Sequence, residues 1–223
     1  MLLVDEHSAE DYLRSRGHVA PGEPVHVREL PGGVSNMVLL VERPEQPARR
    51  FVLKQARHQL RTTREWFASL ERNWREADVL GVCAELMRTP PLVGAPGRWV
   101  ARTPEILFED RDNYLFAMTA APELVSVWKQ DLLEERVEPS IAAACGGLLA
   151  TLHGRSWLDR SLATRLGDRT LFEQLRVEPY YQSLAAQRPE IASPLHGLMQ
   201  SLEKHPRSLV HADFSPKNLL VSD

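Results

Sequence analysis

The chain has 223 residues, of which 43% are hydrophobic and 26% charged, and its formal net charge is −3 at pH 7. This composition is typical of a folded globular protein and excludes disordered, collagen-like and low-complexity chains. The small negative charge supplies no basic field for nucleic acid or for an anionic membrane surface, so we expect neither as a partner. No apolar run approaches the roughly 18 to 20 residues that span a bilayer, and the first residues lack a secretory signal pattern.

The cysteines and the N-terminal pattern give the next expectations. Cys83 and Cys145 lie in apolar helical contexts without metal-ligand spacing, which favours free buried thiols and a cytoplasmic location. A short helix is predicted over residues 8–16, with Ser8 and Asp11 spaced as a capping box and Gly17 ending the helix.

Alternating apolar residues then predict strands, separated by turn residues. The first three strands are joined by short connections, which favours an antiparallel meander. A long helix is expected from Thr62 or Thr63 to about Met87, inserted before a final hairpin. The five strands are expected at 25–30, 37–42, 50–56, 103–109 and 114–118.

The second half of the chain reads as mainly helical. Its prolines are expected to separate the later helices from one another. The helices are predicted at 124–134, 140–153, 171–175, 179–186 and 189–202, and short strands at 208–210 and 219–221. A β-rich front followed by an α-rich back predicts an α+β fold with two lobes.

The segment LVHADFSPKNLLV, residues 209–221, carries the strongest chemical signal. It contains the pattern H-x-D-x-x-x-x-N as His211, Asp213 and Asn218, in a loop between two apolar segments. Phosphoryl transfer uses such a loop, because a carboxylate orients the attacking hydroxyl and an amide oxygen reaches the metal ion on the phosphates. The alternative is an ordinary surface loop with common turn residues.

Upstream residues occur in the order that such a loop requires. The turn PGGVSN brings Gly32, Gly33, Ser35 and Asn36 between two strands, where backbone N–H groups can approach phosphate oxygens. Alone, a Gly-Gly turn is usually only a hairpin turn.

A lysine and a glutamate follow that turn. Lys54 lies in the next strand within VLK, and Glu76 lies in the following helix, where it can pair with Lys54. A strand lysine is usually only solvated, and Glu71 or Glu85 are alternative partners. The order of turn, lysine, glutamate and loop is more specific than any one of its parts.

On these residues the chain resembles the aminoglycoside phosphotransferase and choline kinase family, which has a protein-kinase-like fold. VHADFSPKNLLV is similar to the catalytic segment of that family. Within the family, the likeness is nearest to the 5-methylthioribose kinases. It is carried by the segments FVLKQA, WKQDLL, LLATLH, LRVEPYY and SPKN.

The resemblance implies a fold and a division of the chain. The fold would be a protein-kinase-like two-lobe α+β fold: a five-stranded antiparallel N-lobe sheet with one major helix, then an incomplete, mainly helical C-lobe. The N-lobe, residues 1–118, would bind nucleotide, and residues 119–123 would form the hinge. Residues 124–223 would be the partial C-lobe. Members of the family continue for roughly 100 residues more, so we expect a C-terminally truncated chain that lacks the second metal-binding aspartate.

The resemblance also implies the roles of single residues. Asp213 would be the catalytic carboxylate and His211 would brace its loop. Asn218 would be a ligand of Mg²⁺. Lys54 would contact the phosphates of ATP and Glu76 would support it.

The remaining expectations concern adenine, the acceptor and the assembly. Backbone groups near Met118 and Ala120 would contact adenine, although these residues also suit a plain connection between sheet and helix. Arg176, Tyr180 and Tyr181 are candidates for the acceptor pocket, with helix packing as the alternative. The sequence leaves open whether the chain forms a homodimer.

The sequence therefore leaves one main function and two alternatives. The first is an ATP-dependent kinase that phosphorylates a hydroxyl of a small molecule such as a thiosugar, an amino alcohol or an aminoglycoside. The alternatives are a non-catalytic pseudokinase or nucleotide-binding module, or an inactive truncated fragment.

Overall fold

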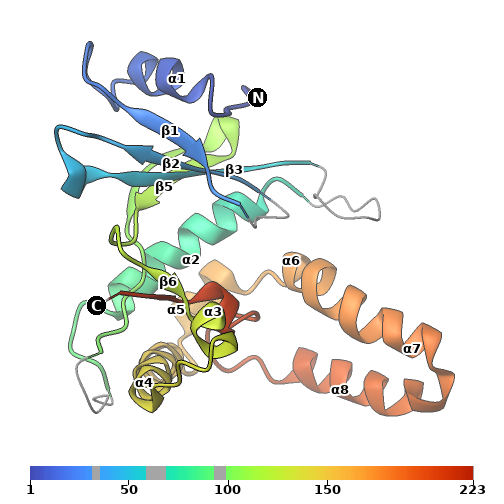
Figure 1. The fold of residues 1–223 in the computed structure, drawn as a ribbon. Helices are drawn as coiled ribbons and strands as arrows, with labels where there is room; N and C mark the ends of the chain where they lie inside the picture. The colour runs from blue at the N-terminus through green and yellow to red at the C-terminus, as the bar shows by residue number, and fades with distance from the viewer. Residues whose placement is uncertain (32–35, 59–68, 93–98, 223) are drawn as a thin grey trace. The chain divides into compact units, whose positions relative to one another are not determined.

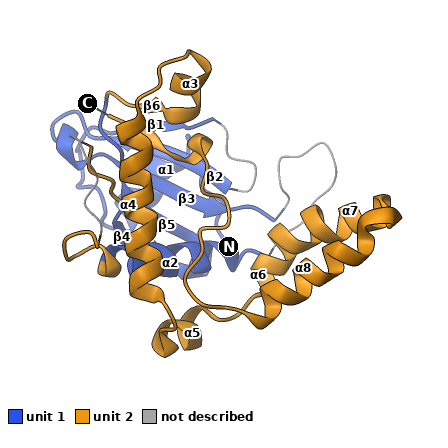
Figure 2. Ribbon diagram, turned by 90° about the horizontal axis from the view of Figure 1, so that it is seen from below, with its two compact units in different colours: residues 1–84, 103–123 blue, residues 85–102, 124–223 orange. Residues whose placement is uncertain are grey.

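The structure is a computed structural model of the chain. It describes residues 1–31, 36–58, 69–92 and 99–222. The chain divides into two compact units (Figure 2). The first comprises residues 1–84 and 103–123, and the second residues 85–102 and 124–223.

A five-stranded antiparallel sheet forms the centre of the first unit, in the order β1-β2-β3-β5-β4 (Figure 1). The sheet and the meander of its first three strands confirm the prediction from the sequence. Short turns at Pro47–Arg49 and Arg111–Asn113 make two of the connections. The strands are β1 His26–Glu29, β2 Asn36–Glu42, β3 Phe51–Ala56, β4 Ile106–Asp110 and β5 Leu115–Thr119.

The odd-numbered residues of the central strands build one core. Successive side chains of a strand point to opposite faces, so Phe51 and Leu53 of β3 share a face with Leu39 of β2 and Leu115 of β5. The N-terminal segment covers this face and adds Val4, Ala9, Tyr12, Leu13 and Val19 to the core. Helices α1 and α2 lie on opposite faces of the sheet (Figure 1).

Helix α1, Ala9–Ser15, was predicted almost to the residue, and Gly17 ends it with a φ of 72°. The predicted capping box is wrong. Ser8 Oγ accepts the amide of Asp5 at 2.9 Å and donates to the Asp5 carboxylate at 2.7 Å. The hydroxyl therefore satisfies the preceding turn and not the first amides of the helix.

Helix α2, Arg72–Leu86, is shorter than predicted. Residues 69–71 are not helical, because the Ser69 hydroxyl contacts the Glu71 carboxylate and accepts the Glu71 amide at 3.3 Å. Such local bonds compete with helical pairing. The predicted cap at Thr62 or Thr63 lies outside the described residues.

From residue 124 on, the second unit has first a short strand and two helices. They are β6 Ser126–Val127, α3 Trp128–Leu133 and α4 Pro139–Ser156. The predicted helix over 124–134 is wrong at its start, because β6 pairs with β7, Leu220–Val221. The predictions of α4 and β7 are confirmed.

A helical hairpin follows. Pro179 does not separate two helices as predicted, whereas Pro189 lies between two of them. Thr170 to Gln187 forms one continuous helical arm in which Pro179 lies inside a π-helix. Pro189 begins a short turn, Pro189–Ile191, and α8 begins only after it. The elements are α5 Arg160–Leu166, α6 Thr170–Phe172, the π-helix η3 Glu173–Gln182, α7 Ser183–Gln187 and α8 Ala192–Lys204.

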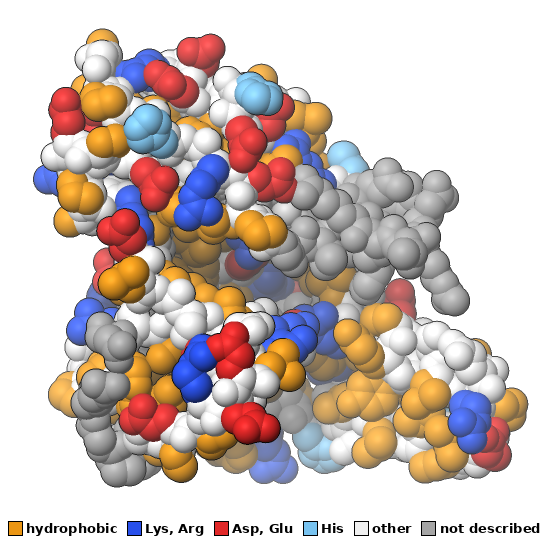
Figure 3. Space-filling model, in the orientation of Figure 1, with side chains coloured by type: hydrophobic (Ala, Val, Ile, Leu, Met, Phe, Trp, Pro, Cys, Tyr) orange, Lys and Arg blue, Asp and Glu red, His pale blue; other side chains and the backbone are white. Residues whose placement is uncertain are grey.

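This hairpin leaves much apolar surface uncovered. Hydrophobic side chains gather over this hairpin (Figure 3). Its exposed hydrophobic residues include Tyr180 of η3, Leu184 of α7, and Leu198 and Leu202 of α8. No helix in the described part of the chain is long and apolar enough to cross a membrane.

The predicted strand at 208–210 is absent from the structure. The Leu209 amide donates instead to the Ser156 hydroxyl at 2.9 Å, and the Leu158 amide donates to the Arg207 carbonyl at 2.7 Å. This segment is therefore fixed to the end of α4 and not to a strand ladder.

Replacing Gln55 with alanine is expected to destabilise the first unit strongly. Gln55 is 2% exposed, donates to the carbonyls of Leu2 at 2.7 Å and Asn113 at 2.9 Å, and accepts the Val4 amide at 2.9 Å. The variant leaves three backbone groups without a partner, which predicts a loss of about 2–4 kcal/mol in the free energy of unfolding. Urea denaturation followed by circular dichroism measures it.

The matched control is Gln46→Ala, because the Gln46 side chain makes one long bond, 3.4 Å, to Glu23. Its expected loss is below about 1 kcal/mol. Equal losses for the two variants would contradict the structural role given to Gln55.

Candidate active site

Lys54 lies in the middle of the sheet and pairs with Glu76. Its neighbours across the sheet are Val38 of β2 and Phe116 of β5. Because it is an even-numbered residue, it points away from the core that contains Gln55. Its ammonium forms an ion pair with the Glu76 carboxylate of α2, and the two side chains are 20% and 36% exposed.

Asn36 extends this group at the start of β2. Its amide nitrogen donates to the second Glu76 oxygen at 3.5 Å. Its own oxygen, Oδ1, is buried and has no partner among the described residues. Leaving a buried acceptor without a partner costs about 1–3 kcal/mol, so a bound donor or cation would be stabilised here. The predicted residues Gly32, Gly33 and Ser35 lie outside the described residues.

Met118 and Ala120 lie at the end of β5. Met118 pairs with Val52 of β3 and with Ile106 of β4, and it is half-buried like Ala120. The guanidinium of Arg50 donates to the next carbonyl, that of Ala121, at 2.5 Å. The connection that follows β5 is therefore bonded to the residue just before β3 of the same unit.

The three motif residues of the second unit come together in one closed loop. The Asn218 amide nitrogen donates to the Asp213 carbonyl at 2.8 Å, and the Asp213 amide donates to His211 Nδ1 at 3.2 Å. The His211 ring packs edge-to-face on Phe214 at 5.6 Å. A short turn at Pro216–Asn218 brings Asn218 back. The spacing H-x-D-x-x-x-x-N thus closes the chain on itself around Asp213.

Ala212, between His211 and Asp213, has a left-handed backbone conformation with a φ of 62°. This conformation brings Cβ close to the following carbonyl oxygen and costs roughly 1–2 kcal/mol in a residue other than glycine. Such strain persists only where the surroundings hold it, and it concentrates at functional sites.

Two cations face the carboxylate of Asp213. Lys217 Nζ lies 3.1 Å from Asp213 Oδ2, and Arg176 Nη2 lies 3.7 Å from the same oxygen. Burial raises the pKa of Asp213, but hydrogen bonds from Lys217 and Asn218 and the charges of Lys217 and Arg176 outweigh it and hold the pKa below its usual value. The carboxylate therefore remains ionised at neutral pH.

Lys217 was not singled out from the sequence, and Arg176 was considered only for an acceptor pocket. The position of Lys217, four residues after Asp213, is a signal that the sequence does contain. No local pattern connects Arg176 with the loop, because the two are 36 residues apart. Tyr180 is 64% exposed and does not pack as a core residue.

Asp213 and Asn218 offer the oxygen donors that suit Mg²⁺. Mg²⁺ is usually held by one or two carboxylates together with phosphates and water, so a small set of protein donors fits it. In the ranges that the structure describes, no group of three or more His, Cys, Asp or Glu side chains could hold a metal ion. The prediction from the sequence gives the Asn218 oxygen to the ion and the Asp213 carboxylate to the acceptor hydroxyl.

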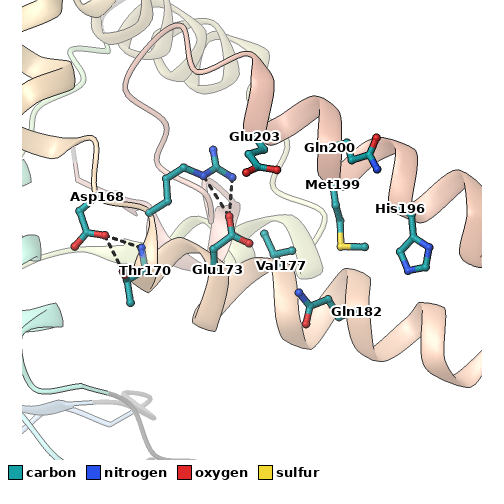
Figure 4. Close-up of a pocket in the computed structure, with 10 residues that line it drawn as sticks. Asp168, Thr170, Glu173, Val177, Gln182, His196, Met199, Gln200 and Glu203 are labelled. Atoms are coloured by element: carbon teal, nitrogen blue, oxygen red, sulfur yellow. Dashed lines mark hydrogen bonds and ion pairs between the residues drawn. The ribbon is translucent and has the colours of Figure 1, made fainter.

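A pocket of about 590 Å³ lies within the helical hairpin of the second unit (Figure 4). Glu173 and Val177 line it from one arm, and Met199 and Glu203 line it from α8. Arg169 crosses between the arms, with one nitrogen on Glu173 at 2.8 Å and another on the Leu202 carbonyl at 3.0 Å. Of the predicted site residues that the structure describes, none lines this pocket.

The fold is α+β, and the loop in its second unit carries the motif H-x-D-x-x-x-x-N as His211, Asp213 and Asn218. The chain belongs to the phosphotransferase enzyme family, whose model matches residues 26–223. This match covers the sheet, the Lys54–Glu76 pair and the whole loop around Asp213. No curated protein matches the chain.

Glycine at position 212 is expected to stabilise the protein. Ala212→Gly removes the cost of the left-handed backbone, so the free energy of unfolding rises by about 1 kcal/mol. The matched control is Ala142→Gly on the exposed side of α4, where glycine lowers helix stability by about 1 kcal/mol. Urea denaturation of both variants measures the change in the free energy of unfolding, which should be a gain for Ala212→Gly and a loss for Ala142→Gly. A loss in both would contradict the strain assigned to Ala212.

Proposed function

We propose that this phosphotransferase is a kinase that transfers the γ-phosphoryl group of ATP to a hydroxyl of a small molecule. The observation that carries the proposal is the closed loop in which Asn218 bonds the Asp213 carbonyl and cations face the Asp213 carboxylate. The family match, which covers this loop, supports phosphoryl transfer as the reaction class.

Asp213 would accept a hydrogen bond from the acceptor hydroxyl and orient its oxygen toward the γ-phosphorus. The transition state of phosphoryl transfer is loose, so orientation of the nucleophile matters more than strong basicity. A carboxylate with a lowered pKa suits this role, because it is ionised yet weakly basic. The proton reaches the carboxylate as the new P–O bond forms and ADP leaves.

Lys54 would place its positive charge on the phosphates of ATP, and Glu76 would hold the lysine in position. Asn36 belongs to the same polar group, because its amide nitrogen donates to Glu76 and its buried oxygen has no partner among the described residues. Backbone groups near Met118 and Ala120 would contact adenine. Each of these residues lies in the first unit.

Asn218 would hold Mg²⁺ through its amide oxygen, while Asp213 faces the acceptor hydroxyl. When bound, the ion neutralises charge on the phosphates. The protein's own part is to keep Asn218 and Asp213 on one rigid loop, which the bond between the Asn218 side chain and the Asp213 backbone achieves.

The acceptor is proposed from the resemblance to 5-methylthioribose kinases. The segments that carry it include LRVEPYY, in the π-helix, and SPKN, in the loop. A thiosugar is therefore the first acceptor to test, followed by an amino alcohol and an aminoglycoside.

Asp213→Asn is expected to lower phosphoryl transfer by about 10²–10⁴-fold, because the amide cannot accept the acceptor proton. The assay is transfer of label from γ-labelled ATP to methylthioribose, choline and kanamycin in the presence of Mg²⁺. The control is Asp159→Asn, since Asp159 only caps α5 through the Leu162 amide and asparagine caps equally well. Full transfer by the Asp213 variant would refute the role of this carboxylate.

Lys54→Met is expected to reduce turnover by about 10²–10³-fold, because a cation on the phosphates is lost. Glu76→Gln should act in the same direction and less strongly, since it only loosens the lysine. Lys129→Met is the control, because Lys129 is exposed on α3. Wild-type turnover in Lys54→Met, as in the Lys129→Met control, would show that Lys54 has no role in the reaction.

A further inference from the structure

Arg176 is held by three acceptors, one for each of its nitrogens. Nε donates to the Ala212 carbonyl at 2.7 Å, and Nη1 donates to the Leu175 carbonyl at 2.8 Å. Nη2 lies 3.7 Å from Asp213 Oδ2. The guanidinium is planar and rigid, so three contacts on different sides fix its position.

The Leu175 carbonyl accepts from Arg176 within the π-helix η3, which contains Pro179. In an α-helix this carbonyl would pair with the amide four residues later, which is the position of Pro179. Proline has no N–H, so that bond cannot form. Pro179 thus opens the helix at the point where Arg176 leaves it, and π-helical turns of this kind are frequent at functional sites.

We propose that Arg176 is a positioning residue for the reaction proposed above. It holds Ala212 in its left-handed conformation by binding the Ala212 carbonyl, and this conformation sets the direction of the Asp213 side chain. Arg176 acts through the loop: its hydrogen bonds go to backbone carbonyls, and its contact with the Asp213 carboxylate is an ion pair at 3.7 Å. The expected effect of Arg176 on turnover rests on the proposed function. The expected effect of Arg176 on the loop does not depend on that function.

Lys217 cannot take over this role. It contacts the Asp213 carboxylate only, its side chain is 56% exposed, and it belongs to the same loop. A point charge from within the loop can offset the charge of Asp213, but it cannot hold the backbone of Ala212. Holding the Ala212 backbone therefore needs the rigid guanidinium of a residue on a different element.

The first measurement is hydrogen–deuterium exchange of the peptide covering residues 208–220 in the full chain. Arg176→Gln and Arg176→Lys should each raise exchange in this peptide by about tenfold, because neither variant can bond all three acceptors. The control is Arg188→Gln, which removes only an exposed ion pair with Glu190 and should leave the peptide unchanged. Unchanged exchange in both Arg176 variants would overturn the proposal.

The second measurement separates positioning from general stability. With Mg-ATP and methylthioribose, Arg176→Gln should lower kcat by about tenfold and leave the KM for ATP unchanged. Adding Ala212→Gly should restore part of kcat, since glycine adopts the left-handed conformation without help. A kcat that Arg176→Lys keeps near the wild-type value and that Ala212→Gly does not restore in Arg176→Gln would show that only the charge matters, and would refute positioning.

The two proposals fail separately. If the wild type transfers no phosphoryl group to any acceptor of the panel, the proposed function fails. The exchange measurement still decides whether Arg176 holds the loop, because it needs neither nucleotide nor acceptor.

Discussion

The alternation of side chains along β3 is the constraint on which the first unit depends. Gln55 points into the core and is bonded to the backbone of the N-terminal segment, whereas its neighbour Lys54 points to the opposite face and pairs with Glu76. A shift of one residue in the pairing of β3 would exchange the two side chains between the faces. It would bury an ammonium in the core and remove the partner of Val4. The same register thus fixes both the core and the candidate phosphate-binding lysine.

The second unit fixes its candidate site by a different device. Its loop stores strain at Ala212, and the strain is held from outside by an arginine on a π-helix. That arginine lies three residues before Pro179, which cannot donate a backbone bond to the helix. Two residues that look like defects, a proline within a helix and an alanine with positive φ, therefore act together on Asp213. Local departures of this kind are expected where function and stability compete.

The sequence predicts the features that depend on local pattern. The strands of the sheet and α4 follow from periodicity, and the loop around Asp213 follows from its motif. Features that depend on distant partners were missed. Ser126 lies in a strand because Val221 pairs with it, and residues 208–210 form no strand because Ser156 takes the amide of Leu209. The effect of Pro179 was misjudged, because a π-helix accommodates it and no local rule predicts that outcome.

The most direct test of the account is a phosphorus NMR spectrum of the full chain with ATP, Mg²⁺ and the panel of acceptors. The account predicts that the γ-phosphate resonance of ATP declines while a phosphomonoester resonance, carbon-coupled to the acceptor, grows with ADP at equal rates. An ATP spectrum that stays unchanged with every acceptor, or one that gives only inorganic phosphate, would contradict the central claim that Asp213 directs transfer to a small-molecule hydroxyl.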